Sequence, residues 1–186
     1  MEPVTLRTAR LELSIPVPAD IDAITDAAQD PDVPRWTTLP APYERSHAED
    51  FVALSLRRWE AGTDLVWAVR VAGAWVGSVG LHGVKPGGDA EIGFWMAKHA
   101  RGHGYLTEAA ARVIDFAFAA PVSLARIEWR AVVGNVASAR AARTLGFRYE
   151  GMLRQALSDP RGRHDGWVAG LLATDDRVPR AWPVLG

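Results

Sequence analysis

The sequence predicts an α/β fold of the α+β kind, with a central mixed, mostly antiparallel sheet of about seven strands flanked by about four helices on both faces. Three observations support this prediction. Short apolar runs with strand patterning recur along the chain, a glycine-rich segment introduces a core-facing helix, and the last segments return to strand patterning. No repeat or polar linker interrupts the 186 residues, so residues 1–186 are expected to form one domain.

The first half of the chain begins with a strand signal. Apolar residues alternate from Leu6 to Ile15, and Pro16 ends the run. Two helices are expected next, and the second begins with the spacing of a capping box, Ser46 to Glu49. Three antiparallel strands follow, separated by turn residues, at 65–71, 74–81 and 90–96.

The second half begins with glycines at 102 and 104, which lead into a helix of three-and-four apolar spacing that extends to Ala117. A further helix can be capped by Asn135, and Gly146 suits a left-handed stop at its end. The remaining strands are predicted at 127–133, 147–153 and 166–173. The only parallel step of the sheet is expected across the helix that follows the glycines.

Composition excludes several classes of protein. A formal net charge of −1 gives no general attraction to nucleic acid or anionic lipid. The chain has no cysteine, which excludes disulfides, thiolate nucleophiles and cysteine-ligated zinc, and we expect no metal site. The start, Met1 to Val4, lacks a signal-peptide pattern, and no run approaches the roughly 18 apolar residues of a membrane span. We therefore expect a cytoplasmic protein with no nucleic-acid or membrane partner.

The segment from Arg101 to Leu106 is typical of a phosphate-binding loop. It lies between a predicted strand and a predicted helix, where backbone N–H groups can converge at the positive end of the helix dipole. Gly102 and Gly104 would let a pyrophosphate approach the main chain, and Arg101 can add a charged hydrogen bond. A plain tight turn is the alternative. The pattern matches neither a Walker loop nor a dinucleotide-binding loop.

A second segment places two polar side chains about one helical turn apart. Asn135 and Ser138 would face the same direction near the start of a helix, so one site can use both. The structural alternatives are a helix cap for Asn135 and a small polar residue of the first turn for Ser138.

Together these segments resemble the GNAT (GCN5-related N-acetyltransferase) family, and the fuller pattern is similar to its branch that acetylates the amino termini of ribosomal proteins. The matching segments follow in order and spacing along nearly the whole chain: Leu6–Leu13, Ala90–Met96, Arg101–Ala109, Asn135–Phe147 and Glu150–Gly151 with Asp165. The resemblance implies acetyl-coenzyme A (acetyl-CoA) as cosubstrate and direct attack by a primary amine in a ternary complex. The resemblance leaves open whether the chain forms a homodimer.

The resemblance also implies individual roles. The pantetheine arm of coenzyme A would lie along Phe94, Trp95 and Met96, and a main-chain N–H near Trp95 or Met96 would face the oxyanion. The other residues expected to contact coenzyme A are Arg101, Gly102, His103, Gly104, Tyr105, Leu106, Thr107, Asn135, Ser138 and Arg140. Trp36, expected in a long loop, and His82 are assigned to the acceptor pocket.

The sequence departs from the family pattern at three positions. Leu106 stands where the family usually has Gly or Ala. Ala142 occupies the position of a tyrosine that protonates the leaving thiolate in many relatives, so Ser138 becomes the general-acid candidate. Leu157 appears where one such enzyme is thought to have its catalytic carboxylate.

The identity of the general base is therefore open. An α-amine, with a pKa of about 7.7 to 8.0, is partly neutral near pH 7, whereas a lysine amine near 10.4 is not. Glu91 is the first choice for the base because it lies on the strand expected to carry the pantetheine, and Glu150, Asp159 and His82 are the alternatives. Direct transfer is favoured over an acyl-enzyme, because Ser138 has no evident histidine partner to activate it.

Other functions remain in competition. The same scaffold can acetylate an antibiotic or a polyamine, for which an acidic acceptor pocket is expected. A non-catalytic CoA-binding sensor would explain the missing tyrosine and carboxylate. A nucleic-acid binder is the least supported reading, because no aromatic and basic cluster stands out. The segment from Asp159 to Asp165 is predicted to be a polar hairpin tip that is solvated, gates the acceptor cleft or contacts a second subunit.

Overall fold

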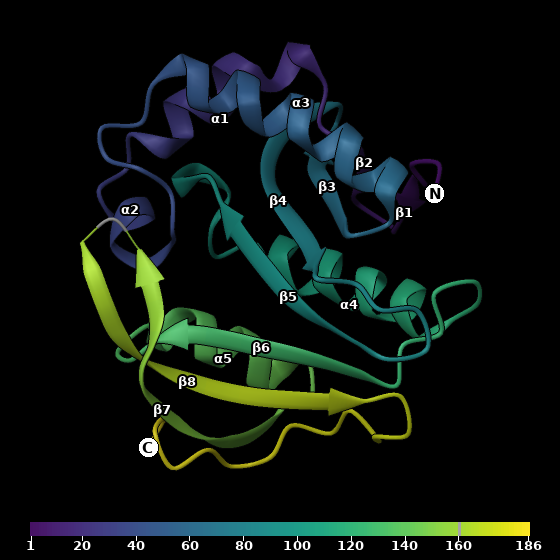
Figure 1. Cartoon of the computed structure of the whole chain (residues 1–186), viewed down its shortest axis with the longest axis vertical. Coiled ribbons are helices and arrows are strands. Elements are labelled where there is room, and N and C mark those ends of the chain that lie inside the picture. The colour runs from purple at the N-terminus through teal and green to yellow at the C-terminus, as the bar shows by residue number, and fades with distance from the viewer. Residues whose placement is uncertain (160) are drawn as a thin grey trace.

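The computed structural model describes residues 1–159 and 161–186, which form one eight-stranded sheet with helices on both faces (Figure 1). The strands are β1 Leu6–Arg7, β2 Glu12–Ser14, β3 Asp64–Val71, β4 Ala74–His82, β5 Asp89–Met96, β6 Arg126–Val132, β7 Arg148–Asp159 and β8 Gly162–Leu172. The helices are α1 Ile21–Ala28, α2 Asp32–Trp36, α3 Arg45–Ala61, α4 Tyr105–Phe118 and α5 Val136–Thr144, with short 3-10 turns at Pro18–Asp20 and Lys98–Ala100.

The sheet has the order β1-β2-β3-β4-β5-β6-β8-β7, and neighbouring strands are antiparallel except for β5 and β6. The parallel pair is connected through α4, as a crossover requires. The predicted fold class and the predicted position of the single parallel step are confirmed.

The first predicted strand is in fact a hairpin, which adds a strand to the expected seven. Leu6 pairs with Leu13, and the turn between them is closed by a 3.0 Å hydrogen bond from the Thr8 N–H to the Leu11 carbonyl. The Thr8 hydroxyl oxygen also accepts from the backbone N–H of Leu11 at 3.0 Å. Thr8 thus stabilises a turn that reverses the direction of the chain, although the alternating pattern of residues 6–15 suggests one continuous strand.

Two predictions about the helices on the N-terminal side are wrong. The capping box predicted at Ser46 to Glu49 lies inside α3, which begins one residue earlier. Its N-cap is Glu44, which has an extended backbone and whose N–H donates to the Nδ1 atom of His47 at 3.0 Å. The His47 imidazole therefore accepts the hydrogen bond that a glutamate side chain accepts in the usual capping box. Trp36, predicted in a long loop, is the last residue of the short helix α2.

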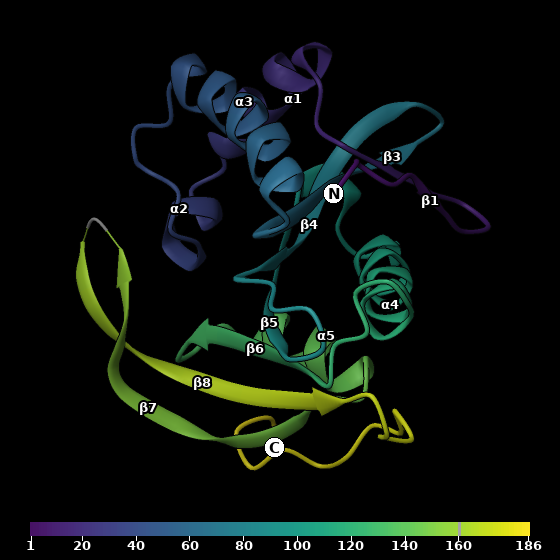
Figure 2. The same ribbon diagram turned by 45° about the vertical axis from the view of Figure 1, so that its right-hand side comes forward.

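The helices form two layers around the sheet. Figure 2 shows α1 and α3 on one face and α4 on the other, where α5 also covers β6. On the α4 side the core contains Val113, Ile114, Ile127 and Trp129, all at most 1 % exposed. A second apolar cluster joins α1 and α3 to β3 and β4, and Tyr43 and Trp75 belong to it. Two apolar clusters therefore hold the helical layers against the sheet, and Trp59 of α3 belongs to the first of them.

An ion pair beneath α1 connects the first helical layer to the sheet. The Arg70 guanidinium donates to both Asp20 carboxylate oxygens, at 2.6 and 2.7 Å, and the two side chains are only 11 % and 4 % exposed. The Val17 N–H donates to the same carboxylate at 2.9 Å. Removing one partner would leave the other charge in a poorly hydrated place.

We therefore predict that Asp20→Ala lowers the free energy of unfolding by about 3 to 5 kcal/mol. Arg7→Ala is the matched control, because its pair with Glu12 joins side chains that are 72 % and 36 % exposed. The control should cost less than about 1 kcal/mol. Urea titration of both variants measures the difference, and equal midpoints would contradict a structural role for the buried pair.

Candidate active site

A cleft of about 840 Å³ lies on the α3 side of the sheet and extends to the glycine loop and α5. Most residues that the sequence assigned to the site line it: Trp36, His82, Glu91, Phe94, Trp95, Met96, Arg101, Gly102, Gly104, Tyr105, Leu106, Thr107, Asn135 and Ser138. His103 and Arg140 do not line it. Both are exposed, His103 against the Tyr105 ring and Arg140 on α5.

The cleft opens where β5 and β6 separate. Their parallel pairing ends at Ile92 and Trp129, whereas β5 continues to pair with β4 as far as Met96. Among the described residues, no strand pairs with the β6-side edge of residues 93–96. The Met96 carbonyl accepts from Arg101 Nε at 3.1 Å, and the other N–H and C=O groups on that edge are available to a ligand. They need a ligand or water as partner, since backbone groups inside a fold are nearly always hydrogen-bonded. An extended amide-containing chain fits this requirement.

The glycine loop lies at one end of the opening. Gly102 and Gly104 have φ angles of +82° and +77°, which favour glycine, and Gly104 is the N-cap of α4. A glycine cap has no side chain to accept from the first N–H groups of the helix. An anion is the natural partner for these donors, because the helix dipole also favours negative charge there.

Arg10 supports this loop from the N-terminal hairpin, a role that the sequence analysis missed. Its guanidinium donates to the His103 carbonyl at 3.1 Å, pairs with Glu108 at 2.6 Å and lies 4.8 Å from the centre of the Tyr105 ring. Burial raises the pKa of Glu108, but hydrogen bonds from Thr8 and Arg10 outweigh it and keep that pKa below its usual value. The first turn of α4 therefore carries a neutralised carboxylate beside an anion-binding backbone.

A second groove of about 440 Å³ continues from the loop between α4, α5 and the C-terminal segment. Gly104 and Thr107 line both cavities. Arg10 and Arg177 contribute positive charge to the groove, and Thr144 closes it on the α5 side. The continuous surface suits an elongated ligand with several negative charges.

Arg101 has a different arrangement from the one that the sequence suggested. Its guanidinium lies 2.8 Å from Asp30 and 3.5 Å from Asp32, and its Nε donates to the Met96 carbonyl at 3.1 Å. The side chain therefore connects the end of β5 to the segment between α1 and α2. Direct contact with a phosphate would have to compete with these acidic partners and stays a prediction.

The start of α5 places Ser138 in the cleft. The Asn135 side chain accepts from the Ser138 N–H at 3.2 Å, which confirms Asn135 as the helix cap. The Trp129 indole N–H donates to the Ser138 hydroxyl oxygen at 3.0 Å. Because an indole can only donate, the hydroxyl proton of Ser138 is left to a further acceptor. The buried ring of Trp129 thus orients the one hydroxyl that the sequence proposed as an acid.

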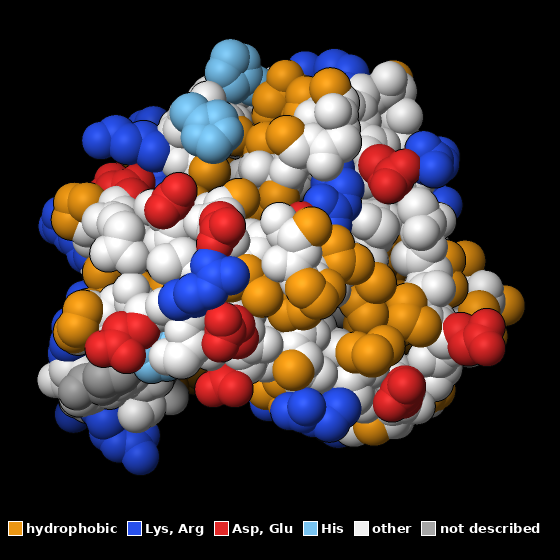
Figure 3. Space-filling view, turned by 90° about the horizontal axis from the view of Figure 1, so that it is seen from above, with side chains coloured by type: hydrophobic (Ala, Val, Ile, Leu, Met, Phe, Trp, Pro, Cys, Tyr) orange, Lys and Arg blue, Asp and Glu red, His pale blue; other side chains and the backbone are white. Residues whose placement is uncertain are grey.

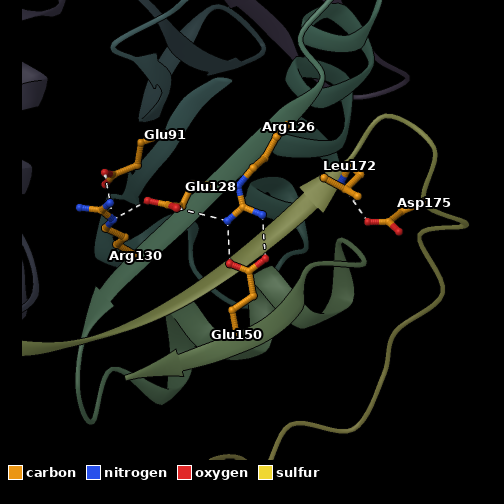
Figure 4. Close-up of polar contacts among 7 residues, drawn as sticks. All are labelled: Glu91, Arg126, Glu128, Arg130, Glu150, Leu172 and Asp175. Carbon is orange, nitrogen blue, oxygen red and sulfur yellow. Dashed lines mark hydrogen bonds and ion pairs between the residues drawn. The ribbon is translucent and has the colours of Figure 1, made fainter. Parts of the chain in front are cut away.

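Glu91, the first choice for the base, belongs to a line of charged groups across β5, β6 and β7 (Figure 4). Its carboxylate lies 3.9 Å from Arg130, which also binds Glu128 at 2.5 Å. Burial raises the pKa of Glu91 above its ordinary value, and the nearby Arg130 and His82 oppose that shift. The structure therefore places Glu91 in the cleft but gives it a cationic neighbour.

Glu150 and Asp159, two alternatives for the base, are engaged elsewhere. Arg126 holds Glu150 in a two-pronged pair at 2.7 and 2.6 Å, which lowers the pKa of Glu150 (Figure 4). This pair passes over Gly170 of β8, where an added Cβ atom would lie 2.1 Å from the guanidinium. Asp159 is hydrogen-bonded by Arg161, which lowers its pKa. Neither residue lines the cleft.

The acceptor end of the cleft contains residues from both sides of the fold. Trp36 of α2 and Phe51 of α3 provide aromatic surface there. Ser78 is 4 % exposed, and its hydroxyl oxygen has no hydrogen-bond partner among the described residues. The sequence signal for Ser78 is its single hydroxyl within the otherwise apolar run 74–81, and Ser78 was not among the predicted site residues.

The hairpin tip that connects β7 and β8 extends toward this end. Arg161 Nη2 donates to the Arg35 carbonyl of α2 at 3.1 Å, so the tip contacts the helix that carries Trp36. Pro160, part of the predicted tip, lies outside the described residues. The contact agrees with the hypothesis of a gate, which stays a prediction.

Charge is mixed over the rest of this side. Figure 3 shows acidic and basic side chains interspersed over α1 and α3. Within residues 1–159 and 161–186, no cluster of three or more His, Cys, Asp or Glu side chains is placed to hold a metal ion. In the same residues, no helix has the length and apolarity needed to cross a bilayer.

Comparison with known proteins identifies similar folds and sequences. The model of the acetyltransferase (GNAT) domain family matches residues 10–148. The N-acetyltransferase p20 of Bacillus licheniformis, itself uncharacterized, is 28 % identical over 155 residues, which are 81 % of this chain and 85 % of p20.

Two solved structures are similar in fold. Mycobacterium smegmatis RimJ, in complex with a CoA disulfide, has a TM-score of 0.85 at 23 % identity, covering 97 % of this chain and 93 % of its own. RimL, a ribosomal L7/L12 α-N-protein acetyltransferase in complex with coenzyme A, has a TM-score of 0.81 at 17 % identity, covering 91 % of this chain and 98 % of its own.

We predict that Gly104→Trp abolishes binding of coenzyme A and leaves the fold intact. The indole would cover the backbone donors of the loop, and an added Cβ atom would lie 3.5 Å from Arg10 Nη2, an ordinary contact distance. The φ of +77° strains any side chain at this position. Gly73→Trp is the matched control, because Gly73 also has a positive φ, +83°, and open surroundings, but lies in the turn between β3 and β4. Calorimetric titration measures both affinities, and unchanged binding by the Gly104 variant would count against the loop.

Proposed function

The chain belongs to the GNAT family of acetyltransferases, and from that premise we propose that it transfers the acetyl group of acetyl-CoA to the N-terminal α-amine of a protein. The observation that supports this most strongly is a single cleft in which the glycine loop, the unpaired edge of β5 and the Ser138 hydroxyl meet. The cosubstrate and the class of reaction follow from the family.

The cleft offers acetyl-CoA a partner for each of its parts. The pyrophosphate would accept from N–H groups at the start of α4, the pantetheine amides would bond to the free edge of residues 93–96, and the thioester would lie near Ser138. The groove beside Arg10 and Arg177 suits the remaining phosphate of the nucleotide.

The acceptor end favours an α-amine over a polycation. Acidic Asp32 and Glu91 are accompanied there by basic Arg58 and Arg130. A polyamine or an aminoglycoside would favour a predominantly acidic pocket, whereas a peptide N-terminus brings only one positive charge. An α-amine also needs less help to become neutral than a lysine does. A ribosomal-protein acceptor would place the reaction in the cytoplasm.

The chemistry is a direct transfer. The neutral amine attacks the thioester carbonyl, a backbone N–H near Trp95 or Met96 stabilises the oxyanion, and the C–S bond breaks. Ser138 donates its hydroxyl proton to the leaving thiolate, because the Trp129 indole already occupies an acceptor position on the same oxygen.

The proposal is tested by incubating the protein with acetyl-CoA and a panel of amines. The panel contains peptides with free N-termini, the same peptides with blocked N-termini and one internal lysine, spermidine and an aminoglycoside. Release of the CoA thiol and the mass of the product identify the acceptor. Transfer to free N-termini alone supports the proposal, and preference for spermidine or the aminoglycoside overturns it. Tight CoA binding with no transfer would indicate a sensor.

We predict that Ser138→Ala lowers kcat by about 10- to 100-fold while the affinity for acetyl-CoA changes little, since general-acid catalysis is lost and binding is not. Trp129→Phe keeps an aromatic ring at this buried position but removes the indole donor, so kcat should fall in the same direction by a smaller factor. Steady-state kinetics and calorimetry of both variants measure the two effects. A change in affinity with constant kcat would assign Ser138 to binding alone.

A further inference from the structure

We propose that His82, oriented by Asp64, is the base that removes the proton from the acceptor amine. This inference rests on the proposed acetyl transfer and names the proton acceptor of that same site. It follows from a carboxylate–imidazole pair on neighbouring strands, from two glycines beneath the ring and from the engagement of the competing carboxylates.

The pair fixes the protonation pattern of the ring. His82 Nδ1 lies 2.9 Å from the Asp64 Oδ1 atom, and the Asp64 side chain is 15 % exposed. A carboxylate can only accept, so Nδ1 carries the proton and Nε2 of the neutral ring presents a lone pair. No other hydrogen bond reaches Nε2 from the described residues. Nε2 is therefore a free acceptor on a ring that a partner holds in place.

The ring lies beside the expected position of the acetyl group. Gly80 of β4 and Gly93 of β5 are opposite each other, and a Cβ atom added to them would lie 3.0 and 3.1 Å from His82 Nε2. The missing side chains leave room for the imidazole to lie across the two strands. Gly93 immediately precedes Phe94, where the backbone edge proposed for the pantetheine begins. His82 is also 43 % exposed, so solvent can take the proton onward.

Each competing carboxylate is less suited. Glu91 is the cross-strand partner of His82, and burial keeps its pKa above the ordinary value despite Arg130. Its carboxylate nevertheless lies 3.9 Å from the Arg130 guanidinium, whereas no cationic group among the described residues is bound to His82 Nε2. Glu150 is held by Arg126, and Asp159 is bound at the hairpin tip. Arg58 lies 3.6 Å from the Asp64 oxygen that His82 also contacts, so three charged neighbours surround the imidazole: Asp64, Arg58 and Glu91.

The proton balance of the reaction is complete with these groups. His82 Nε2 takes one proton from the ammonium form of the acceptor and releases it to water. The neutral nitrogen forms the new C–N bond, and the C–S bond breaks. The Ser138 hydroxyl gives its proton to the leaving thiolate. The nitrogen loses a second proton as the amide forms, and that proton restores the Ser138 hydroxyl. One acetyl group moves and one proton is released in total.

The test measures kcat/KM against pH for the wild type, His82→Gln, Asp64→Asn and Glu91→Gln. We expect the wild-type rate to rise with pH through an acid limb, because the protonated ring cannot accept. His82→Gln should lower kcat/KM near neutral pH by about 100-fold or more and lose that limb. Asp64→Asn should lower kcat more than it raises KM, by about 10- to 100-fold. Glu91→Gln should keep the limb.

Two further arms separate chemistry from structure. His82→Ala leaves a space above the two glycines, and added imidazole should restore part of its activity, which a purely structural role would not allow. Asp89→Asn is the matched control for Asp64→Asn, because Asp89 pairs with Lys85 at 3.1 Å on the same sheet but outside the cleft. Its kinetics should match the wild type.

The outcomes distinguish the two proposals. If the wild type is active but the His82→Gln variant keeps the acid limb, or the Glu91→Gln variant loses it, the assignment of His82 is overturned. Acetyl transfer as the proposed function then stays intact. Failure of His82→Ala to respond to imidazole while the protein stays folded and binds CoA also counts against His82. A wild type that acetylates no amine overturns the proposed function itself.

Discussion

The separation of β5 from β6 after the Ile92–Trp129 pair is the feature on which the rest of the site depends. One edge of β5 stays bonded to β4, which keeps the strand rigid, and the other edge is left without a strand partner. Backbone groups in that position need a ligand or water to satisfy them. The glycine loop, α5 and the acceptor end all border this opening, so one local divergence of two strands creates the cleft.

Around that opening the fold supplies positive potential without a large net charge. The start of α4 offers uncapped N–H groups, and Arg10 braces the loop from a hairpin more than ninety residues away in sequence. Glu108 would oppose an anion there, but Thr8 and Arg10 already hydrogen-bond its carboxylate. A chain with a net charge of −1 can therefore bind a polyanion through local arrangement alone.

A β-bulge determines which polar groups face the acceptor. The turn at Ala72 and Gly73 pairs Val71 with Ala74, and without irregularity that register would set Asp64 opposite Leu81. The shift between Val69 and Arg70 adds one residue on β4, and Asp64 is opposite His82 instead. Because side chains alternate along a strand, a shift of one residue decides whether these two groups meet.

Local periodicity and turn chemistry were enough to predict most of the sheet, its parallel step, the glycine loop and the Asn135 cap, and they placed Ser138 beside Asn135 at the start of a helix. The bulge that brings Asp64 opposite His82, the indole that orients Ser138 and the acidic partners of Arg101 are visible only in the folded chain. These contacts join segments whose spacing in sequence carries no pattern. Register, strand divergence and side-chain pairing are settled by packing across the sheet, and no local rule encodes them.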